Sequence, residues 1–219
     1  MPPPQSEAEL LARAEDLGGR TIVELAAQLE IELPPDPARA KGFVGQLVER
    51  ALGGACTTAS APDFPGLGVE LKTLPIDREG RVKESTFVCT APLAAADEAV
   101  WEHSRVRAKL ARVLFLTVER DAAPGARRFG AAFLWSPDAT QEAALRADWE
   151  ELMGRIGAGD VEALDARRGV HLQLRPKGAN ARARALGFDA DGAPFWAPKR
   201  AFYLRSRFTR SILERAGFA

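Results

Sequence analysis

The spacing of apolar residues near the start of the chain predicts three helices. Ser6 is followed three residues later by Glu9, and Thr21 by Glu24, which is the capping-box signature of a helix N-terminus. Apolar residues at helical spacing follow both signatures. A third amphipathic stripe runs over residues 41–52 and stops at a pair of glycines, so a third helix is expected there.

Shorter apolar runs, separated by glycine, proline and charged residues, predict strands farther along. Residues 69–74 alternate in the manner of a strand, and they are expected to form a hairpin with residues 86–90 through a polar turn. A helix is expected to begin at Ser136-Pro137 and to end at Gly157. The other expected elements are a helix or turn at 100–109, strands at 113–118, 129–135, 170–175 and 202–204, and helices at 161–166 and 211–216. The pattern indicates a mixed α/β fold.

The composition is that of a globular protein, with 46% hydrophobic and 27% charged residues among 219. No apolar run approaches the length of a membrane span, and the first residues lack the pattern of a signal peptide, so a cytoplasmic protein with no membrane partner is expected. Cys56 and Cys89 form no CxxC pair, and with only two histidines the composition does not favour a zinc site.

The formal net charge of zero conceals an asymmetry along the sequence. From Asp165 to the end there are 12 Lys and Arg against 4 Asp and Glu, a net charge of +8, which the preceding residues balance. A basic segment of this kind is typical of nucleic-acid binders, because neutralising phosphates dominates their affinity. A solvated basic face with no ligand is the alternative reading.

The stretch from Asp63 to Lys72 carries the clearest chemistry. In a strand, Glu70 and Lys72 lie on the same face, and the Gly/Pro turn that follows Asp63 can bring this acid beside them. Carboxylates are the oxygen ligands that Mg²⁺ takes, and a neighbouring lysine can position a water. The pattern predicts metal-assisted phosphodiester hydrolysis, although D(x)nExK also arises by chance.

Other charged and aromatic residues could complete such a site. Glu49 lies beside the apolar face of the third expected helix and can supply a third carboxylate, or remain a surface residue. Lys109 is expected at the mouth of a central strand, where catalytic residues are often carried. Tyr203, the only tyrosine, lies among arginines in the basic segment, as aromatic residues of nucleic-acid grooves do. His171 could be catalytic, but no acid or nucleophile lies at a readable spacing, so a structural or surface role is expected.

Five segments of the chain resemble the MutH family of mismatch-repair endonucleases. The segments are Lys41-Gly42-Phe43-Val44-Gly45, Asp63 to Thr73, Thr86 to Cys89, Leu172 to Lys177, and Phe202 to Leu204. They occur in order and cover nearly the whole chain. The resemblance implies one domain with a restriction-endonuclease-like mixed β-sheet flanked by helices, in which a helical N-terminal arm and a basic C-terminal lobe from about residue 165 surround a DNA cleft.

The resemblance also implies an activity and its residues. It implies a monomer that uses Mg²⁺, for which Mn²⁺ can substitute, to nick the unmethylated strand at hemimethylated GATC sites in double-stranded DNA, after activation by MutL and, indirectly, MutS. Asp63, Glu70, Lys72 and Lys109 match catalytic residues, and Glu49 matches a further metal-site acid. The matches on the DNA-binding side are Lys41, Gly42, Arg175, Pro176, Lys177 and Tyr203. Residues 57–62 and 186–199 match only loosely.

Two other functions use the same residues. A methylation-sensitive restriction endonuclease that cuts both strands at GATC would need the same catalytic set, and strand scission on hemimethylated duplex separates the two. A DNA-binding module with a decayed active site is the alternative from another class. The presence of Asp63, Glu70 and Lys72 argues against it.

Overall fold

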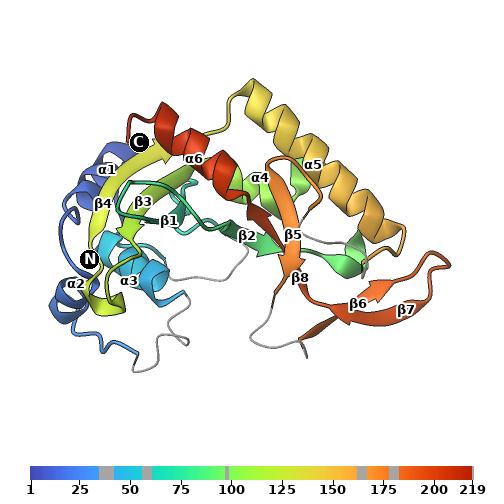
Figure 1. The fold of residues 1–219 in the computed structure, drawn as a ribbon, viewed down its shortest axis with the longest axis horizontal. Helices are drawn as coiled ribbons and strands as arrows, with labels where there is room; N and C mark the ends of the chain where they lie inside the picture. The colour runs from blue at the N-terminus through green and yellow to red at the C-terminus, as the bar shows by residue number, and fades with distance from the viewer. Residues whose placement is uncertain (35–41, 56–60, 97–98, 162–166, 178–182, 219) are drawn as a thin grey trace. The chain divides into compact units, whose positions relative to one another are not determined.

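The computed structural model describes residues 1–34, 42–55, 61–96, 99–161, 167–177 and 183–218 (Figure 1). The chain folds into two compact units, and each is assembled from separate segments of the sequence. Unit 1 comprises residues 1–84, 111–136 and 210–219, and unit 2 comprises residues 85–110 and 137–209. The boundary expected near residue 165 therefore falls inside unit 2, and the expected arrangement of two arms around a DNA cleft stays a prediction.

A three-stranded mixed sheet forms the centre of unit 1. The strand β1 (Glu70–Ile76) pairs in parallel with β3 (Val113–Glu119), which pairs antiparallel with β4 (Phe129–Trp135). A short 3-10 helix, η3 (Pro124–Ala126), lies between β3 and β4 in the chain.

Three helices pack on this sheet, and they are the three that the sequence predicts. They are α1 (Glu7–Glu15), α2 (Ile22–Gln28) and α3 (Phe43–Leu52). Thr21 makes a complete capping box with Glu24, whereas the Ser6 hydroxyl accepts the backbone N–H of Glu9 without the reciprocal bond. Helix α1 packs against β4, and α3 packs against β1.

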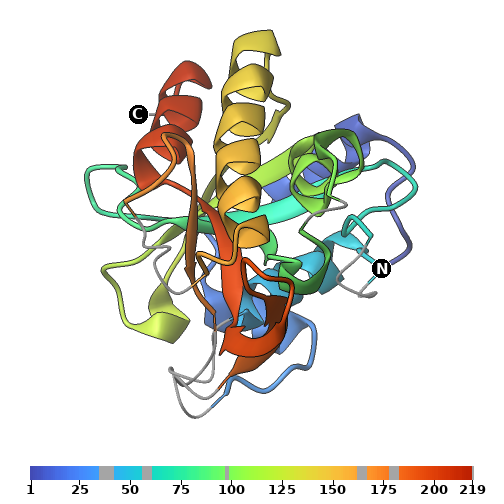
Figure 2. The ribbon, with the colours of Figure 1, turned by 90° about the vertical axis from the view of Figure 1, so that its right-hand side faces the viewer.

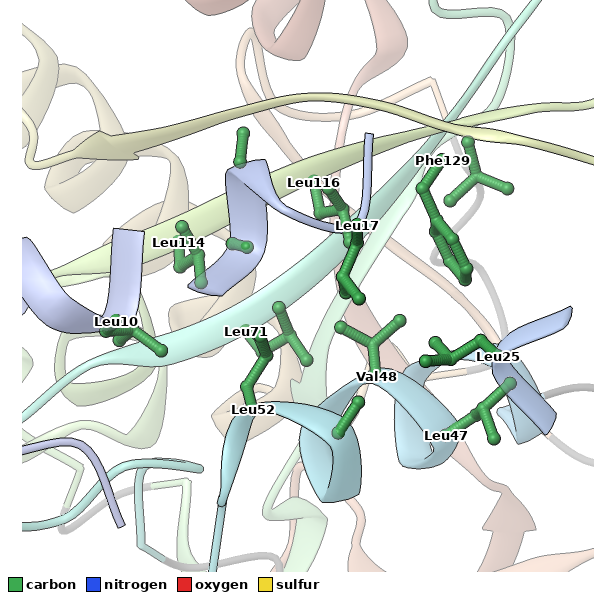
Figure 3. Packing of buried hydrophobic residues seen from close by; sticks show 14 of the residues in the cluster. Leu10, Leu17, Leu25, Leu47, Val48, Leu52, Leu71, Leu114, Leu116 and Phe129 are labelled. Atoms are coloured by element: carbon green, nitrogen blue, oxygen red, sulfur yellow. The ribbon is translucent and has the colours of Figure 1, made fainter. Parts of the chain in front are cut away.

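The core of unit 1 lies between these helices and one face of the sheet (Figure 3). Leu71 of β1 and Leu114 and Leu116 of β3 meet the leucines of the helices there. The fully or nearly fully buried leucines from the helices and from the turn after α1 are Leu10, Leu17, Leu25, Leu47 and Leu52. Because side chains alternate along a strand, Glu70 and Lys72 lie on the opposite face from Leu71.

The expected hairpin between residues 69–74 and 86–90 is wrong. Strand β1 pairs with β3, and the second segment forms β2 (Thr86–Thr90) in a sheet of unit 2. The polar turn closes on itself instead: Asp77 accepts the backbone N–H groups of Glu79 and Arg81, and Ile76 forms an isolated bridge with Val82. After that bridge the chain leaves the sheet, so the turn is not followed by a second strand paired with β1.

Unit 2 contains an antiparallel sheet in the order β2-β8-β5 and a separate hairpin. In this sheet β8 (Arg200–Leu204) is central and β5 (Leu172–Pro176) is its second neighbour. The hairpin pairs β6 (Arg184–Phe188) with β7 (Pro194–Pro198). The helical elements are η1 (Leu93–Ala95), η2 (Trp101–His103), α4 (Arg105–Leu110) and the long α5 (Ala139–Gly157), coloured yellow to orange in Figure 2. Trp149 of α5 is a core residue, as expected.

Several boundaries in this part differ from the sequence prediction. Helix α5 begins after Asp138, whose carboxylate makes a capping box with Gln141, so Ser136-Pro137 precedes the helix instead of starting it. The last helix, α6 (Ser206–Arg215), begins earlier than expected. The β6–β7 hairpin was not predicted, and most of the helix expected at 161–166 lies outside the described residues. Within the part of the chain that the structure describes, no helix is long and apolar enough to span a membrane.

Candidate functional site

Strand β1 places Glu70 and Lys72 together, as the alternation predicts. The ammonium nitrogen of Lys72 lies 2.5 Å from Oε1 of Glu70, and the two residues are only 9% and 4% exposed. Their strand partners in β3 are Phe115 and Val113, both fully buried. A carboxylate and an ammonium group are costly to bury alone, and pairing compensates part of the cost.

Asp63 is brought to the same strand by a tight loop. Its Oδ2 accepts the backbone N–H of Leu71 at 2.8 Å, so its carboxylate lies at the residue next to Glu70. The loop is closed by two hydrogen bonds between the backbones of Phe64 and Val69, and the Phe64 ring is buried. Gly68 has a φ of +67°, a conformation that glycine adopts without strain. The grouping of Asp63, Glu70 and Lys72 therefore exists in the folded chain.

The C-terminal end of α3 lies against the Asp63 loop. The carbonyl of Glu49 accepts the N–H of Gly54, and the carbonyl of Asp63 accepts the N–H of Ala55 at 3.1 Å. A Cβ atom at Gly54 would collide with Cγ of Glu49 and would lie 3.3 Å from the Asp63 carbonyl oxygen. Only glycine fits there, and its absent side chain lets the Glu49 side chain approach the loop.

The residues in this region have the chemistry that a hard divalent cation requires, because their side-chain oxygens belong to carboxylates. Asp63 and Glu70 are adjacent, and Glu49 comes from a neighbouring element. Among the described residues no three His, Cys, Asp or Glu side chains are already gathered around one point. The donor set therefore fits Mg²⁺ in kind, and Glu49 as the third ligand stays a prediction.

Lys109 is placed in a different unit from these three residues. It belongs to α4 in unit 2 and is 6% exposed, whereas Asp63, Glu70 and Lys72 belong to unit 1. Strand β3 begins four residues later, at Val113, and the expected position of Lys109 at the mouth of that strand stays a prediction. Its role near a phosphate stays a prediction.

In unit 2 two adjacent aromatic rings with a cation at each end form a row on one face of the β2-β8-β5 sheet. The guanidinium carbon of Arg175 lies 5.6 Å from the centre of the Tyr203 ring, and this ring meets Phe87 edge to face at 5.5 Å. The ammonium of Lys177 lies 4.1 Å from the Phe87 ring centre and donates to the hydroxyl of Thr90 at 2.9 Å. We call Arg175, Tyr203, Phe87 and Lys177 the cation–aromatic row.

Strand register explains why these side chains share a face. Tyr203 lies between Phe87 on β2 and Gln173 on β5, and Arg175 follows Gln173 by two residues. Arg175, Tyr203 and Phe87 therefore point to the same side of the sheet. The other face carries fully buried Leu172, Leu174, Phe202 and Leu204. Burial of the apolar face therefore leaves the polar and aromatic groups on the opposite face of the sheet. Each attraction between a cation and a ring helps to fix the side chains of the row in place.

The surroundings shift the pKa values of two members of the row. Partial burial raises the pKa of the Tyr203 hydroxyl above its ordinary value, so the group remains a neutral hydrogen-bond donor at neutral pH. Partial burial lowers the pKa of Lys177 below its ordinary value of 10.5. A partly desolvated ammonium of this kind binds an incoming acceptor with little loss of hydration.

A buried carboxylate on α5 holds the beginning of β5. Asp148 is 5% exposed and accepts the backbone N–H groups of Val170, His171 and Leu172 at 2.7, 2.6 and 2.8 Å. His171 stacks on Phe208 with ring centres 4.5 Å apart, in agreement with the structural role expected for it. The strand that carries Arg175 is therefore anchored at its first residues.

The remaining predicted DNA-binding residues are distributed over both units. Pro176 ends β5, is exposed, and pairs with Arg200. Gly42 precedes α3 in unit 1 with a φ of +92°, a left-handed conformation, and Lys41 lies outside the described residues. The next described element after Lys177 is strand β6, beyond residues 178–182.

Sequence reasoning missed two aromatic residues that the structure exposes. Phe87 was assigned only to a strand, although the run Thr86 to Thr90 contains it as the one large ring that alternation could turn to the polar face. Trp196 was not singled out; it is 68% exposed on the unpredicted hairpin. Neither residue could be placed without knowing which strands pair.

Comparisons with known proteins agree with this architecture. Residues 52–148 match the family described as "DNA mismatch repair enzyme MutH". The chain is 49% identical over 215 residues to the DNA mismatch repair protein MutH of Klebsiella pneumoniae (strain 342), covering 97% of this chain and 93% of that protein.

Other relatives show a similar degree of likeness. The identity is 46% over 219 residues with the protein of the same name from Serratia proteamaculans (strain 568), covering 99% of this chain and 96% of that one. It is 50% over 215 residues with the one from Salmonella newport (strain SL254). The mixed α/β units agree with the restriction-endonuclease-like fold of this family. The chain thus belongs to the MutH family, the GATC-specific endonucleases of DNA mismatch repair.

Proposed function

We propose that this chain nicks the unmethylated strand of hemimethylated GATC sites by Mg²⁺-dependent hydrolysis, with Asp63, Glu70 and Lys72 as the catalytic residues. The observation that carries the proposal is the grouping of these three side chains at one end of β1. In this grouping the Asp63 carboxylate binds the Leu71 amide, and Leu71 lies between Glu70 and Lys72 on the strand. Two carboxylates and one ammonium are thereby gathered at the same three residues of β1. Such a set suits phosphodiester hydrolysis and has no evident use in a binding module.

Each residue has a role that follows from its position. A divalent cation held by carboxylates would neutralise charge on the phosphate and acidify a bound water. Asp63 and Glu70 are oriented for this, one by the Leu71 amide and the other by the strand. The Lys72 ammonium, on the same face as Glu70, can hold a water in line for attack on the phosphorus or bind an oxygen of the phosphate. Glu49 is proposed as a third carboxylate, and Lys109 as a source of positive charge near the phosphate.

We propose that the cation–aromatic row reads the recognition sequence. Adenine presents N7 and the N6 amino group in the major groove, and methylation of N6 adds bulk and removes one donor. Arg175 can make a two-pronged contact with guanine, while the neutral Tyr203 hydroxyl is suited to sense the amino group. Pro176, Lys177, Lys41 and Gly42 are proposed to position the duplex.

The proposed setting of this activity comes from the family. We propose that the protein acts as a monomer, that Mn²⁺ can replace Mg²⁺, and that MutL triggers cleavage after MutS has found a mismatch. The likeness over nearly the full chain supports these points. They are tested by sedimentation, by cation titration of nicking, and by adding MutL to the assay.

A nicking assay on a GATC duplex in its three methylation states tests the proposal. We expect cleavage of the unmethylated strand alone in hemimethylated DNA and none in fully methylated DNA. Asp63→Asn, which keeps an acceptor for the Leu71 amide, should remove nicking and retain DNA binding. Glu79→Ala is the matched control, because this acid is exposed on the surface of the same unit. Full nicking by the Asp63 variant would refute the catalytic assignment.

The competing activity is cleavage of both strands by a methylation-sensitive restriction endonuclease. The same assay separates the two, because a double-strand break in hemimethylated duplex would favour that alternative. A chain that binds GATC duplexes but leaves every methylation state intact, with either cation, would instead be a DNA-binding module.

A further inference from the structure

The outer face of the β6–β7 hairpin presents an exposed apolar pair. Trp196 and Leu186 are directly opposite each other in the ladder, and they are 68% and 40% exposed. Two other tryptophans of unit 2, Trp101 and Trp149, are only 3% and 4% exposed. Leaving a tryptophan in water forgoes the large stabilisation that its burial would supply, so an exposed Trp–Leu pair marks a contact surface.

The inner face of the same hairpin is already packed. Gly187 and Ala197 are buried there, and a Cβ atom at Gly187 would lie 3.8 Å from Cβ of Leu93 and 3.6 Å from the ring of Phe195. One face of the hairpin therefore packs on η1, and the opposite face, which carries Trp196 and Leu186, points away from η1. Trp196 and Leu186 belong to a supported surface and not to a loose loop.

Charge and continuity identify what would bind this surface. Arg184 pairs with Pro198 and so lies on the outer face, two residues along β6 from Leu186. The base of the hairpin is hydrogen-bonded to the end of β5: the N–H of Lys177 donates to the carbonyl of Lys199 at 2.8 Å, and the N–H of Lys199 to that of Ala183 at 3.0 Å. The cationic end of the hairpin thus continues from the cation–aromatic row.

The opposite end of the hairpin has the opposite charge. Asp189 and Asp191 lie at the turn, where the Asp189 carboxylate accepts the N–H groups of Asp191 and Ala193. An anion that approached the hairpin would be attracted to its base and repelled from its tip. A bound duplex would therefore run past the base and the middle of the outer face.

We propose that the outer face of the hairpin, through Arg184, Leu186 and Trp196, contacts duplex DNA outside the GATC sequence. In this contact Arg184 meets a backbone phosphate, while Trp196 and Leu186 cover deoxyribose sugars. Contacts of this kind carry no sequence information; they add affinity and fix the orientation of the duplex. The proposal rests on the proposed function, since it requires that the cation–aromatic row binds the recognition sequence.

The intrinsic fluorescence of Trp196 offers a direct readout. Without a divalent cation, the protein is bound to a duplex that ends at the GATC sequence, or to one extended by about one helical turn of 10 base pairs on each side. We expect the extended duplex to shield a tryptophan from acrylamide quenching and the short duplex to leave it accessible. The shielded component should be absent from the Trp196→Phe variant.

Affinity measurements complete the test. Trp196→Ala should reduce the affinity advantage of the extended duplex by about tenfold, the scale of losing one buried aromatic contact, and leave the short duplex unaffected. Val170→Ala is the control, because Val170 is another exposed apolar residue of unit 2, with 55% exposure. Since Trp196 is mostly in water, its replacement should not change the unfolding midpoint.

Three outcomes would overturn the proposal. In the first, both duplexes bind and GATC is preferred, but Trp196 stays accessible; the inference then fails while the proposed function stands. In the second, Trp196→Ala abolishes a concentration-dependent self-association, which assigns the face to a second copy of the chain. In the third, neither duplex binds, which removes the proposed function and this inference together.

Discussion

The polar groups of β1 and those of the β2-β8-β5 sheet are held in opposite environments. On β1, Glu70 and Lys72 are nearly inaccessible and paired at 2.5 Å. In the cation–aromatic row, Arg175 is exposed, Tyr203 is partly so, and each touches a ring instead of an opposite charge. Hydrolysis benefits from buried charges that need no reorganisation, whereas reading a base requires groups that DNA can reach. We propose that this difference in burial distinguishes the groups that cut from the groups that read.

The largest expected effect comes from breaking the buried pair on β1. Glu70→Ala should lower nicking by about 10³-fold or more, because it removes several kcal/mol of charge stabilisation. It should also lower the free energy of unfolding by about 3–5 kcal/mol, since Lys72 is left buried without its carboxylate. Nicking rates and urea titrations measure the two effects.

A double variant separates these two losses. Replacing both members, as Glu70→Leu with Lys72→Met, should recover most of the stability and none of the activity, because no uncompensated charge remains. Equal unfolding midpoints for the single and the double variant would show that the pair is not buried as the structure has it.

The next largest effect concerns the anchor of the reading strand. Asp148→Ala leaves three backbone N–H groups at the start of β5 without their acceptor, which should cost about 3 kcal/mol of stability. The stability of Asp148→Asn, which keeps one acceptor oxygen, should lie between that of the alanine variant and that of the parent. Urea unfolding measures both, and an unchanged midpoint for the alanine variant would contradict the anchoring role.

A smaller effect is expected at Tyr203. Tyr203→Ala should reduce the discrimination between hemimethylated and fully methylated GATC by about tenfold, the scale of one base contact, without changing unfolding at β1. Tyr203→Phe keeps the edge-to-face contact with Phe87 and removes only the hydroxyl. Competition binding with the two duplexes is the measurement. If the alanine variant discriminated as well as the parent, Tyr203 would not be the sensor.

The smallest effect is a pH dependence located at His171. Burial lowers the pKa of this imidazole below its ordinary value of 6.5, so the unfolded chain takes up the proton first as the pH falls. The contribution of the neutral imidazole to stability is therefore fully present above pH 6.5. It declines as the pH falls from 6.5 to the lower pKa of the folded state. His171→Phe, which can retain the stacking on Phe208, should remove that decline. Urea midpoints above and below this pH window measure it.

Much of the candidate catalytic site could be predicted because its spacing is local. Glu70 and Lys72 are two residues apart on one strand, and Asp63 returns through a short loop, so alternation and a Gly/Pro turn were enough to group them. The reading surface is assembled from three strands far apart in the sequence. Tyr203 and Arg175 were named, but Phe87, which touches both Tyr203 and Lys177, was not.

The sequence by itself determined what depends on near neighbours. The capping box at Thr21, the amphipathic face of α3 and the shared face of Glu70 and Lys72 all follow from residues a few positions apart. Only the tertiary structure decided that β1 pairs with β3 instead of β2, and that Phe87 lies beside Tyr203. Strand pairing is set by which distant apolar faces can be buried together, and no local pattern contains that information.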